Sequence, residues 1–338
     1  MKTLVCKSPG LLEYSNREKP QLKSDHAIIK IKRVGICGTD LHAFEGTQPF
    51  FNYPRILGHE LAGELIEFDN APGFKKGETV SFIPYFNCGH CIACRMRKPN
   101  CCVNLEVCGV HADGGMVEYL SVPSSSLLHG DGLTVDELAL VEPLAIGAHG
   151  VGRAAVRPGE FVLVVGAGPI GLATAQFAQI AGAKVIIADI NKQRLEFCRK
   201  NLKIDFIINV MESNHQKQLM QITNGEMPTV VIDATGNLNA INNAFQLMAH
   251  GARYVLVGLQ KGDISFSHPE FHKKEGTLMS SRNAVIKDFE QVISCIKNGI
   301  IKPATYITHR VHFDKVIEEF ENWLRPGNTV IKAMIEMG

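Results

Sequence analysis

Three residues near the start of the chain have the types and spacing of a catalytic metal site. Cys37, His59 and Glu60 fall in glycine-flanked turns within 24 residues. A thiolate, an imidazole and a carboxylate can hold a zinc ion tetrahedrally and leave the fourth position open for a substrate. A single cysteine or histidine is more often structural, but three ligand types this close together favour a zinc ion that takes part in chemistry.

A second group of metal-ligand residues follows further along the chain. Five of the ten cysteines lie between Cys88 and Cys102. Cys88, Cys91 and Cys94, with either Cys101 or Cys102 as the fourth ligand, can close around one ion as a tetrahedral structural site. Adjacent thiolates rarely point the same way, so one of the last two is expected to be spare. In an intracellular protein, such clustering indicates metal binding rather than disulfides.

A further acid, Glu142, lies in an apolar segment at 138–149 that predicts a single helix. A carboxylate within an apolar helix face is costly unless it is paired, protonated or bound to a metal. The alternative is an exposed acid at a helix start, where the helix dipole favours negative charge. The apolar surroundings make Glu142 a further candidate ligand.

The overall charge argues against polyanionic partners. The chain has 338 residues, 45% of them hydrophobic, and a formal net charge of +1. That balance favours neither nucleic acid nor an anionic membrane surface as a partner. A zinc finger that binds nucleic acid would need a basic helix after the last cysteine, and residues 103–110 are not one. The N-terminus lacks the apolar core of a signal peptide, so we expect a cytoplasmic protein.

The residues at 161–171 have the order of a dinucleotide-binding turn. Five apolar residues at 161–165 predict a buried parallel strand, and G-A-G-P-I-G follows. The first glycine permits the tight turn, the second lets the backbone approach a pyrophosphate, and the third packs the next helix against the strand. Free N–H groups at the start of that helix would hold the phosphates. The residues of this fingerprint are Gly166, Gly168, Pro169, Ile170 and Gly171.

The acid at the end of the next strand, Asp189, indicates NAD as the cofactor. It lies 18 residues past Gly171, where a carboxylate can bond both ribose hydroxyls. The same carboxylate would repel a 2′-phosphate, although Lys192 and Arg194 are near enough to contact the cofactor. The alternative is a membrane helix, because residues 161–183 carry no charge. The clustered glycines and the β-rich continuation argue against that alternative.

The alternation of strands and helices continues beyond Asp189 and predicts a doubly wound parallel sheet. The carboxyl ends of its strands, including the one that ends at Gly258, should form the ligand crevice. The length of the chain predicts two domains. We expect a dinucleotide-binding domain at 147–282 and a catalytic domain made of residues 1–146 and 283–338.

A catalytic zinc ion together with a nicotinamide fits the oxidation of an alcohol. Zinc acts on the substrate oxygen as a Lewis acid, and the nicotinamide takes the hydride. The proton must then leave for water. Thr39 and His42 lie two and five residues past Cys37. A hydroxyl near the metal and an imidazole beyond it would form a relay for that proton.

Over essentially its full length, the chain resembles the zinc-dependent medium-chain dehydrogenase/reductase superfamily. The matching motifs are G-I-C-G-T-D-x-H at 35–42, G-H-E at 58–60, the four-cysteine lobe, E-P-L at 142–144 and GAGPIG at 166–171. The resemblance implies a Rossmann domain and a mostly β, GroES-like catalytic domain with a zinc lobe. It also implies NAD, two zinc ions per chain and assembly into a dimer or tetramer.

The resemblance also implies which residues bind the metals. The catalytic ligands of the superfamily match Cys37, His59 and either Glu60 or Glu142. Classical alcohol dehydrogenases carry a cysteine where this chain has Glu142, and the glutamate resembles the polyol and sugar dehydrogenase branch. In that branch the two glutamates trade roles, and the sequence leaves open which one binds zinc directly. The structural ligands match Cys88, Cys91, Cys94 and Cys102, which sets Cys101 aside.

A narrower resemblance, to bacterial L-galactonate and L-gulonate 5-dehydrogenases, is carried by residues 48–55, 269–275 and 281–283. It implies oxidation of a secondary hydroxyl of a sugar acid, at C5, to a ketone. The alternatives are a polyol dehydrogenase of the sorbitol type and an L-threonine dehydrogenase. From a different class, a non-catalytic regulator could keep the cofactor fold, but it should have lost a ligand or the relay, and none is lost.

A sugar acid needs a cation several ångströms from its reacting carbon. Arg282 is the leading candidate, because it follows the last β/α crossover and an arginine fork matches a carboxylate with two bonds. It could instead serve the cofactor phosphates or a structural salt bridge. His272, Lys273 and Lys274 are weaker candidates, since a lysine-rich loop is usually only solvated.

Overall fold

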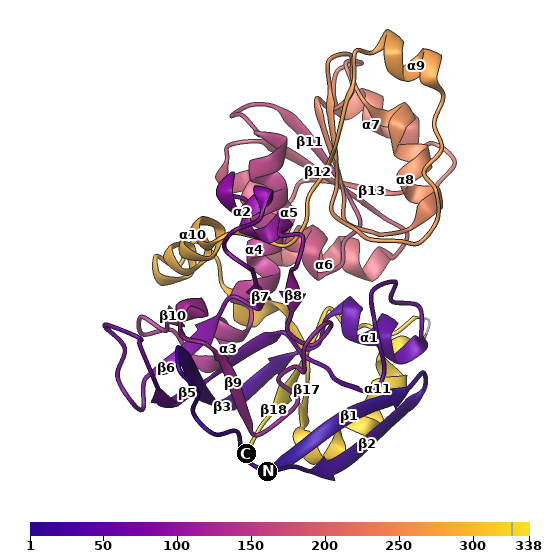
Figure 1. The fold of residues 1–338 in the computed structure, drawn as a ribbon. Helices are drawn as coiled ribbons and strands as arrows, with labels where there is room; N and C mark the ends of the chain where they lie inside the picture. Colours follow the sequence, from indigo (N-terminus) through magenta and orange to yellow (C-terminus); the bar gives the residue numbers. More distant parts are fainter. Residues whose placement is uncertain (326) are drawn as a thin grey trace. The chain divides into compact units, whose positions relative to one another are not determined.

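The computed structural model describes residues 1–325 and 327–338 (Figure 1). The chain folds into two compact units. The first is discontinuous and comprises Met1–Glu142 and Val285–Gly338, whereas the second is the continuous segment Pro143–Ala284. The second unit is therefore inserted into the first.

The first unit consists mainly of β structure. Its strands are β1 (Lys2–Ser8), β2 (Leu11–Asn16), β3 (His26–Gly35), β4 (Arg55–Ile56), β5 (Glu60–Phe68), β6 (Thr79–Phe82), β7 (Tyr85–Phe86), β8 (Glu106–Val107), β9 (Tyr119–Pro123), β10 (Leu127–His129), β17 (Ile307–His312) and β18 (Lys332–Glu336). Its α-helices are α1 (Gly38–Glu45), α2 (Ile92–Arg95), α3 (Val135–Ala139), α10 (Ile286–Lys297) and α11 (Val316–Leu324).

A seven-stranded sheet forms the centre of this unit. Its strand order is β10-β6-β5-β3-β18-β17, and β9 also pairs with β3. Strands β17 and β18 are parallel, whereas β3 is antiparallel to each of β5, β9 and β18. A three-stranded sheet, β2-β1-β4, and a ribbon, β7-β8, complete the β structure. The strand β3 therefore has the largest number of partners in the sheet.

The packing of β3 fixes the position of the turn that carries Cys37. Its side chains Ile29, Ile31 and Val34 lie in the hydrophobic core of the unit. Burying a side chain of this kind contributes roughly 1.5–3 kcal/mol, so the strand cannot shift its register without a large loss. The strand ends at Gly35, two residues before Cys37. The core thus fixes the starting point of the turn that carries this thiol.

The second unit is the doubly wound sheet that the sequence predicts. Six parallel strands have the order β13-β12-β11-β14-β15-β16, which is 3-2-1-4-5-6 along the unit and typical of dinucleotide-binding folds. The strands are β11 (Phe161–Val165), β12 (Lys184–Asp189), β13 (Phe206–Asn209), β14 (Val230–Asp233), β15 (Arg253–Leu256) and β16 (Thr277–Ser280). The helices are α4 (Val141–Ala154), which begins in the first unit, α5 (Pro169–Ile180), α6 (Lys192–Leu202), α7 (His215–Ile222), α8 (Leu238–Ala244) and α9 (His268–Lys273).

The helix predicted at 138–149 is interrupted, and this corrects the sequence analysis. The helix α3 ends at Ala139 and α4 begins at Val141. A proline has no N–H to donate and fits only the first turn of a helix, so Pro143 requires a new helix to start just before it. Glu142 consequently lies in the first turn of α4. It is 5% exposed, so the alternative of an exposed helix-start acid is wrong.

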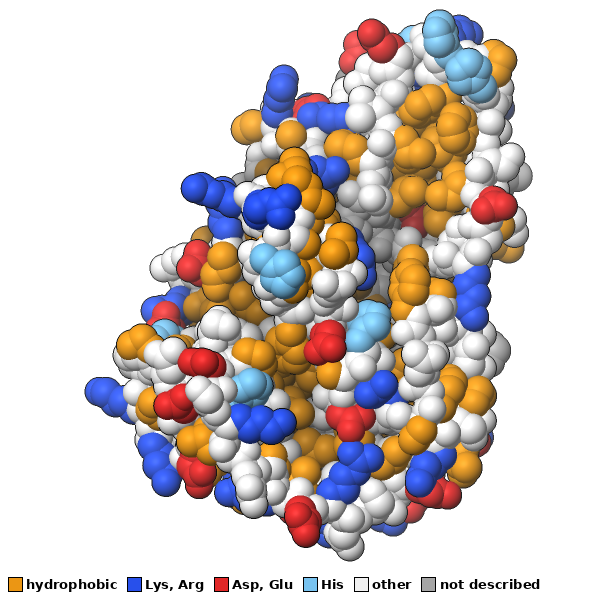
Figure 2. Space-filling model, in the orientation of Figure 1, with side chains coloured by type: hydrophobic (Ala, Val, Ile, Leu, Met, Phe, Trp, Pro, Cys, Tyr) orange, Lys and Arg blue, Asp and Glu red, His pale blue; other side chains and the backbone are white. Residues whose placement is uncertain are grey.

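Two further observations concern the surface. Every helix among the described residues is too short or too polar to span a bilayer. On the face shown in Figure 2, positive and negative side chains are interspersed rather than separated into patches of one sign. This mixture agrees with the formal net charge of +1.

Candidate active site

The structure brings Cys37, His59 and Glu60 together. Cys37 is the N-cap of α1, directly beyond β3, and Glu60 is the first residue of β5 with His59 immediately before it. Because β3 and β5 are paired with Gly35 opposite Glu60, the two turns meet at the same end of the sheet. Their ligand atoms all lie within 4.8 Å of one another. One ion can therefore contact all three residues.

Gly35 is required by the position of Glu60. A Cβ atom on residue 35 would lie 2.2 Å from Glu60 Oε2, well inside the contact distance of any side chain. The carboxylate lies across the backbone of β3, and only a glycine leaves room for it. The first glycine of the G-I-C motif thus has a packing role in holding this acid.

Asp40 connects the two turns that carry the ligands. Its Oδ2 accepts a hydrogen bond from the backbone N–H of Cys37 at 2.9 Å, and its Oδ1 accepts one from Gly58 at 3.0 Å. The same Oδ1 lies 3.8 Å from His59 Nδ1. Burial lowers the pKa of His59, but the negative groups of Asp40 and Cys37 outweigh burial and raise that pKa well above its ordinary value. Asp40 therefore ties the backbone at Cys37 to the backbone at Gly58, the residue before His59.

A buried lysine neutralises Glu60. Lys332, the first residue of β18, places its Nζ 2.5 Å from Glu60 Oε1 and 2.6 Å from Oε2, and also donates to the carbonyl of Ile36 at 3.0 Å. The lysine side chain is 2% exposed and that of the glutamate is fully buried. Burial lowers the pKa of Lys332, yet the negative groups of Glu60 and Cys37 raise it overall. The lysine is thus held in its charged form.

Glu142 lies beside this group but has a different partner. Its Oε1 accepts a hydrogen bond from the hydroxyl of Tyr85, the first residue of β7. Both side chains are buried, and burial raises the pKa of Glu142 to about 7. The charges of His59 and Glu60 act on it electrostatically. Of the two glutamates, the structure groups Glu60 with Cys37 and His59, and places Glu142 outside that group.

The two relay candidates lie on α1. Thr39 is half-buried and His42 is exposed. Residues three apart on a helix are neighbours on one face. The pair therefore extends from the turn of Cys37 towards solvent.

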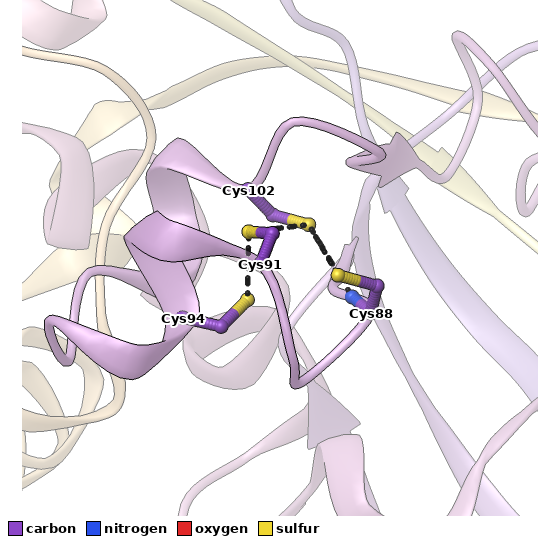
Figure 3. A group of neighbouring side chains, drawn as sticks. All are labelled: Cys88, Cys91, Cys94 and Cys102. Carbon is purple, nitrogen blue, oxygen red and sulfur yellow. Dashed lines mark hydrogen bonds between the residues drawn. The ribbon is translucent and has the colours of Figure 1, made fainter.

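The four-cysteine lobe has the geometry of a closed metal site (Figure 3). The Sγ atoms are 3.4 Å apart for Cys88 and Cys102, 3.8 Å for Cys91 and Cys102, and 3.5 Å for Cys91 and Cys94. Sulfurs about 2.3 Å from one tetrahedral zinc ion would lie roughly 3.8 Å from each other. Hydrogen bonds from backbone N–H groups lower the pKa of Cys91 to about 6, which favours the thiolate that a metal requires. Cys101 is exposed and lies outside the group.

The glycine-rich turn of the second unit has the shape that a pyrophosphate requires. Gly166 has a φ of +102°, and a Cβ on Gly171 would lie 1.8 Å from the carbonyl oxygen of Gly166. Gly168 is the N-cap of α5, with Pro169 as the first helical residue and Ile170 as the second. The free N–H groups at this helix start are suited to an anion.

Asp189 and Arg194 flank this turn. Asp189 Oδ2 accepts from the N–H of Ala167 at 2.5 Å and Oδ1 from that of Asn191 at 2.7 Å. The carboxylate therefore fixes the turn while its remaining lone pairs stay suited to ribose hydroxyls. A guanidinium nitrogen of Arg194 lies 3.9 Å from where a Cβ on Gly168 would be. A negative and a positive group thus both lie next to the glycine-rich turn.

Gly258 has a packing role at the end of β15. A Cβ at this position would lie 2.1 Å from the backbone nitrogen of Gly236, which follows β14. The neighbouring Asp233 accepts hydrogen bonds from the N–H groups of Thr235 and Gly236 at 3.1 and 3.2 Å. The carboxyl ends of β14 and β15 are therefore locked together beside the glycine-rich turn.

The cations considered for a substrate carboxylate differ in their surroundings. Arg282 is exposed and follows β16, and the Oγ of the adjacent Ser281 is buried without a hydrogen-bond partner among the described residues. Lys274 donates to the carbonyls of residues 245, 246 and 248 and thus caps the segment after α8. His272 and Lys273 are exposed on α9. Only Arg282 lies at the carboxyl end of a sheet strand.

Sequence reasoning missed three residues that contact the candidate ligands or the backbone beside them: Asp40, Tyr85 and Lys332. Asp40 is part of the G-I-C-G-T-D motif, and its capping position three residues past Cys37 was a usable signal. Tyr85 and Lys332 reach their partners across 57 and 272 residues. Nothing in their local sequence marks such contacts.

Comparison with known proteins shows that the chain is similar to zinc-binding dehydrogenases. The alcohol dehydrogenase GroES-like domain matches residues 23–131, and the zinc-binding dehydrogenase family matches residues 169–298. L-galactonate-5-dehydrogenase of Escherichia coli (strain K12) is 46% identical over 99% of this chain and 98% of its own. A sorbitol dehydrogenase of Halalkalibacterium halodurans is 31% identical over 91% of this chain and 92% of its own.

A solved structure extends the comparison to three dimensions. An alcohol dehydrogenase from E. coli CFT073, complexed with NADH, is 32% identical and superposes with a TM-score of 0.91 over 99% of both chains. The fold and the relatives agree over 99% of the chain. The chain belongs to the zinc-binding dehydrogenase family, with an alcohol dehydrogenase GroES-like domain in its first unit and a Rossmann sheet in its second.

Proposed function

We propose that the protein oxidises a secondary hydroxyl of a sugar acid, L-galactonate or L-gulonate at C5, to a ketone, with zinc and NAD. The observation that carries this proposal is the 46% identity to L-galactonate-5-dehydrogenase over 99% of the chain. The sorbitol dehydrogenase is less similar, at 31%. The first unit supplies a metal-ligand group and the second a dinucleotide-binding turn, which are the parts that this reaction needs.

The residues of the first unit fit a zinc ion. A thiolate, an imidazole and a carboxylate within 4.8 Å of one another leave one tetrahedral position free, as catalytic zinc requires. When bound, zinc supplies a Lewis acid for the substrate oxygen and the nicotinamide of NAD accepts the hydride. We assign Cys37, His59 and Glu60 to this ion, with Glu142 beside them. The four cysteines of the lobe would hold a second, structural ion.

The chain's own residues provide an exit for the proton. Thr39 is half-buried and lies two residues past Cys37, on the first turn of α1, and in this proposal its hydroxyl receives the proton of the substrate hydroxyl. His42 follows on the same helix face and is exposed. An imidazole can accept and release a proton near neutral pH. In this proposal the proton passes from Thr39 to His42 and then to water.

The cofactor preference provides the first test. The catalytic efficiency of the wild type should be higher with NAD than with NADP, because Asp189 would repel a 2′-phosphate. Asp189→Ala should lower the efficiency with NAD by about 10–100-fold, in line with a charged hydrogen bond of roughly 1.5–3 kcal/mol. The efficiency with NADP should stay the same or rise. Steady-state kinetics with each cofactor measures both values.

Asp205→Ala is the matched control for that substitution. Asp205 is an exposed carboxylate of the same unit, just before β13. Its removal should leave the ratio of the two efficiencies unchanged. Equal efficiencies of the wild type with NAD and NADP would contradict the assigned role of Asp189.

The substrate provides the second test. L-galactonate, L-gulonate, the matching neutral polyols and L-threonine should be compared by NADH formation, and the wild type should favour a sugar acid. We assign Arg282 to the substrate carboxylate, so Arg282→Ala should lower the efficiency with the acid by about 10–100-fold. The efficiency with the neutral polyol should fall much less, because it carries no carboxylate for the guanidinium to bind.

Lys273→Ala serves as the control cation. Lys273 lies on α9 with 65% of its side chain exposed. Its removal should affect neither substrate. Equal losses on acid and polyol in Arg282→Ala would reassign Arg282 to the cofactor. A wild type that prefers the neutral polyol would return the protein to the sorbitol type.

We also infer that the protein works in the cytoplasm as a homo-oligomer. All ten cysteines are free thiols, which suits a reducing compartment and leaves the lobe available for metal. The strand β16 is the edge of the parallel sheet among the described residues, and three of its four residues are exposed. Such an edge is suited to pairing with a second copy. Light scattering of the purified protein measures the assembly.

A further inference from the structure

We propose that Tyr85 is a positioning residue for Glu142, and that through it the four-cysteine lobe supports the catalytic metal centre. The inference takes from the proposed function only the assignment of Cys37, His59 and Glu60 to the catalytic ion. It does not depend on which alcohol is the substrate.

The contact between Tyr85 and Glu142 is buried on both sides. The tyrosine is 7% exposed and the glutamate 5%. The phenol hydroxyl donates to Glu142 Oε1, and the tyrosine ring packs edge-on against Phe289 with 6.2 Å between the ring centroids. Removing the hydrogen-bond partner of a buried carboxylate costs free energy, and it leaves the orientation of the carboxylate less well defined. The hydroxyl therefore fixes the orientation of the Glu142 carboxylate. This carboxylate interacts electrostatically with His59 and Glu60.

The position of Tyr85 depends in turn on the lobe. Tyr85 opens β7, which pairs with β8, and Tyr85 lies opposite Val107. Cys88 follows β7 after a single residue, and Cys102 precedes β8. The N–H of Cys88 donates to Cys102 Sγ at 3.3 Å, and the two sulfurs lie 3.4 Å apart. The ribbon of β7 and β8 is thus the stem of the lobe.

An ion in the lobe would join the two chain segments at the end of this ribbon, where Cys88 follows β7 and Cys102 precedes β8. Bound by both Cys88 and Cys102, it would hold β7 and β8 in register and keep Tyr85 directed at Glu142. The structural ion then contributes to catalysis without touching the substrate. In this proposal Glu142 is an outer-shell carboxylate beside the ligands, and losing the support of such a group typically changes metal affinity by about 10–100-fold.

The test is the rate at which the holoenzyme loses zinc to a chelating dye, measured without substrate. Two ions per chain should give two phases of zinc release. The phase that is missing in Cys37→Ser belongs to the catalytic ion, and the remaining phase belongs to the lobe ion. In Tyr85→Phe the catalytic ion should leave about tenfold faster or more, while the lobe ion leaves at the wild-type rate. An unchanged catalytic phase would overturn the proposal.

Two further variants distinguish an effect on the orientation of Glu142 from a general destabilisation of the fold. Tyr254→Phe removes another buried hydroxyl, which bonds the carbonyl of Ile241 at 3.1 Å in the second unit, and should leave both release phases unchanged. In a Glu142→Cys background, Tyr85→Phe should have no further effect on the catalytic phase, because the carboxylate it orients is gone. A tenfold effect that persists in this background would mean that Tyr85 acts through the fold and not through Glu142.

The link to the lobe is tested by Cys94→Ser, which removes one lobe ligand. Release of the catalytic ion should then accelerate, and adding Tyr85→Phe should accelerate it no further. Additive effects would show that lobe and tyrosine act independently. If Cys94→Ser does not fold, selective removal of the lobe ion from the wild type and from Tyr85→Phe gives the same comparison. A Cys37→Ser protein that still holds two ions would contradict the assigned catalytic site instead, so the two failures are distinguishable.

Discussion

Cys37→Ser should lower the catalytic efficiency by about a thousandfold or more while leaving the fold in place. The thiolate is one of three ligands within 4.8 Å, and a serine hydroxyl is a poor replacement for it. Loss of the Lewis acid removes several kcal/mol of transition-state stabilisation, and each 1.36 kcal/mol is about tenfold in rate. Elemental analysis should find about one zinc ion per chain in the variant and about two in the wild type.

Cys101→Ser is the control for this substitution. Cys101 is exposed and lies outside both ligand groups. Its replacement should preserve two ions and full activity. A wild type that contains one ion or none after careful preparation would contradict the assignment of two zinc sites. A Cys37→Ser enzyme that keeps its activity would show that the Cys37 thiolate is not needed for the reaction.

Lys332→Met should lower the free energy of unfolding by about 3–5 kcal/mol, the usual effect of breaking a buried ion pair by removing one partner. Methionine has a similar length but carries no charge, so Glu60 would remain buried with its main cation gone. The two carboxylate oxygens, at 2.5 and 2.6 Å from Nζ, would both lose a charged hydrogen bond. Denaturant unfolding of the zinc-loaded protein measures the change.

The matched control is Lys297→Met. Lys297 on α10 pairs with Asp131 at 3.0 Å, but both side chains are almost half exposed, and such surface pairs contribute about 0–1 kcal/mol. The double variant Lys332→Met with Glu60→Gln should recover part of the lost stability, because the uncompensated charge is gone. A Lys332→Met protein as stable as the wild type would mean that Glu60 is not held as a charged partner.

The parts of the site that the sequence predicts are those specified by neighbouring residues. The turn at Gly166–Gly171 and the acid Asp189 follow from a local order of strand, turn, helix and strand, which the structure reproduces. The lobe and the pairing of Cys37 with His59 follow from ligand types at short spacing. In each case the chemistry requires a fixed geometry over few residues, so the pattern is visible along the chain.

The parts that could not be predicted depend on contacts between distant segments. Lys332 reaches Glu60 only because β18 is placed next to β3 in the sheet, and strand order is not written in either segment. The strand β16 was missed because Thr277–Ser280 is a mostly exposed edge without an apolar run. The division between Glu60 and Glu142 likewise depends on how separate segments fold together, because Glu60 and not Glu142 lies within the group formed with Cys37 and His59, and no local motif marks this difference.

The discontinuity of the first unit has a consequence for the order in which the protein is made. On the ribosome, Cys37, His59 and Glu60 emerge early, but β18 emerges only after the whole second unit has been synthesised. Until then the edge of β3 that pairs with β18 has no partner strand, and Glu60 lacks its lysine. The nascent first unit therefore lacks the cation that pairs with Glu60 when the three candidate ligands leave the exit tunnel. If the proposed site holds zinc, we expect its loading to be a late event, after the nucleotide-binding unit is free to fold.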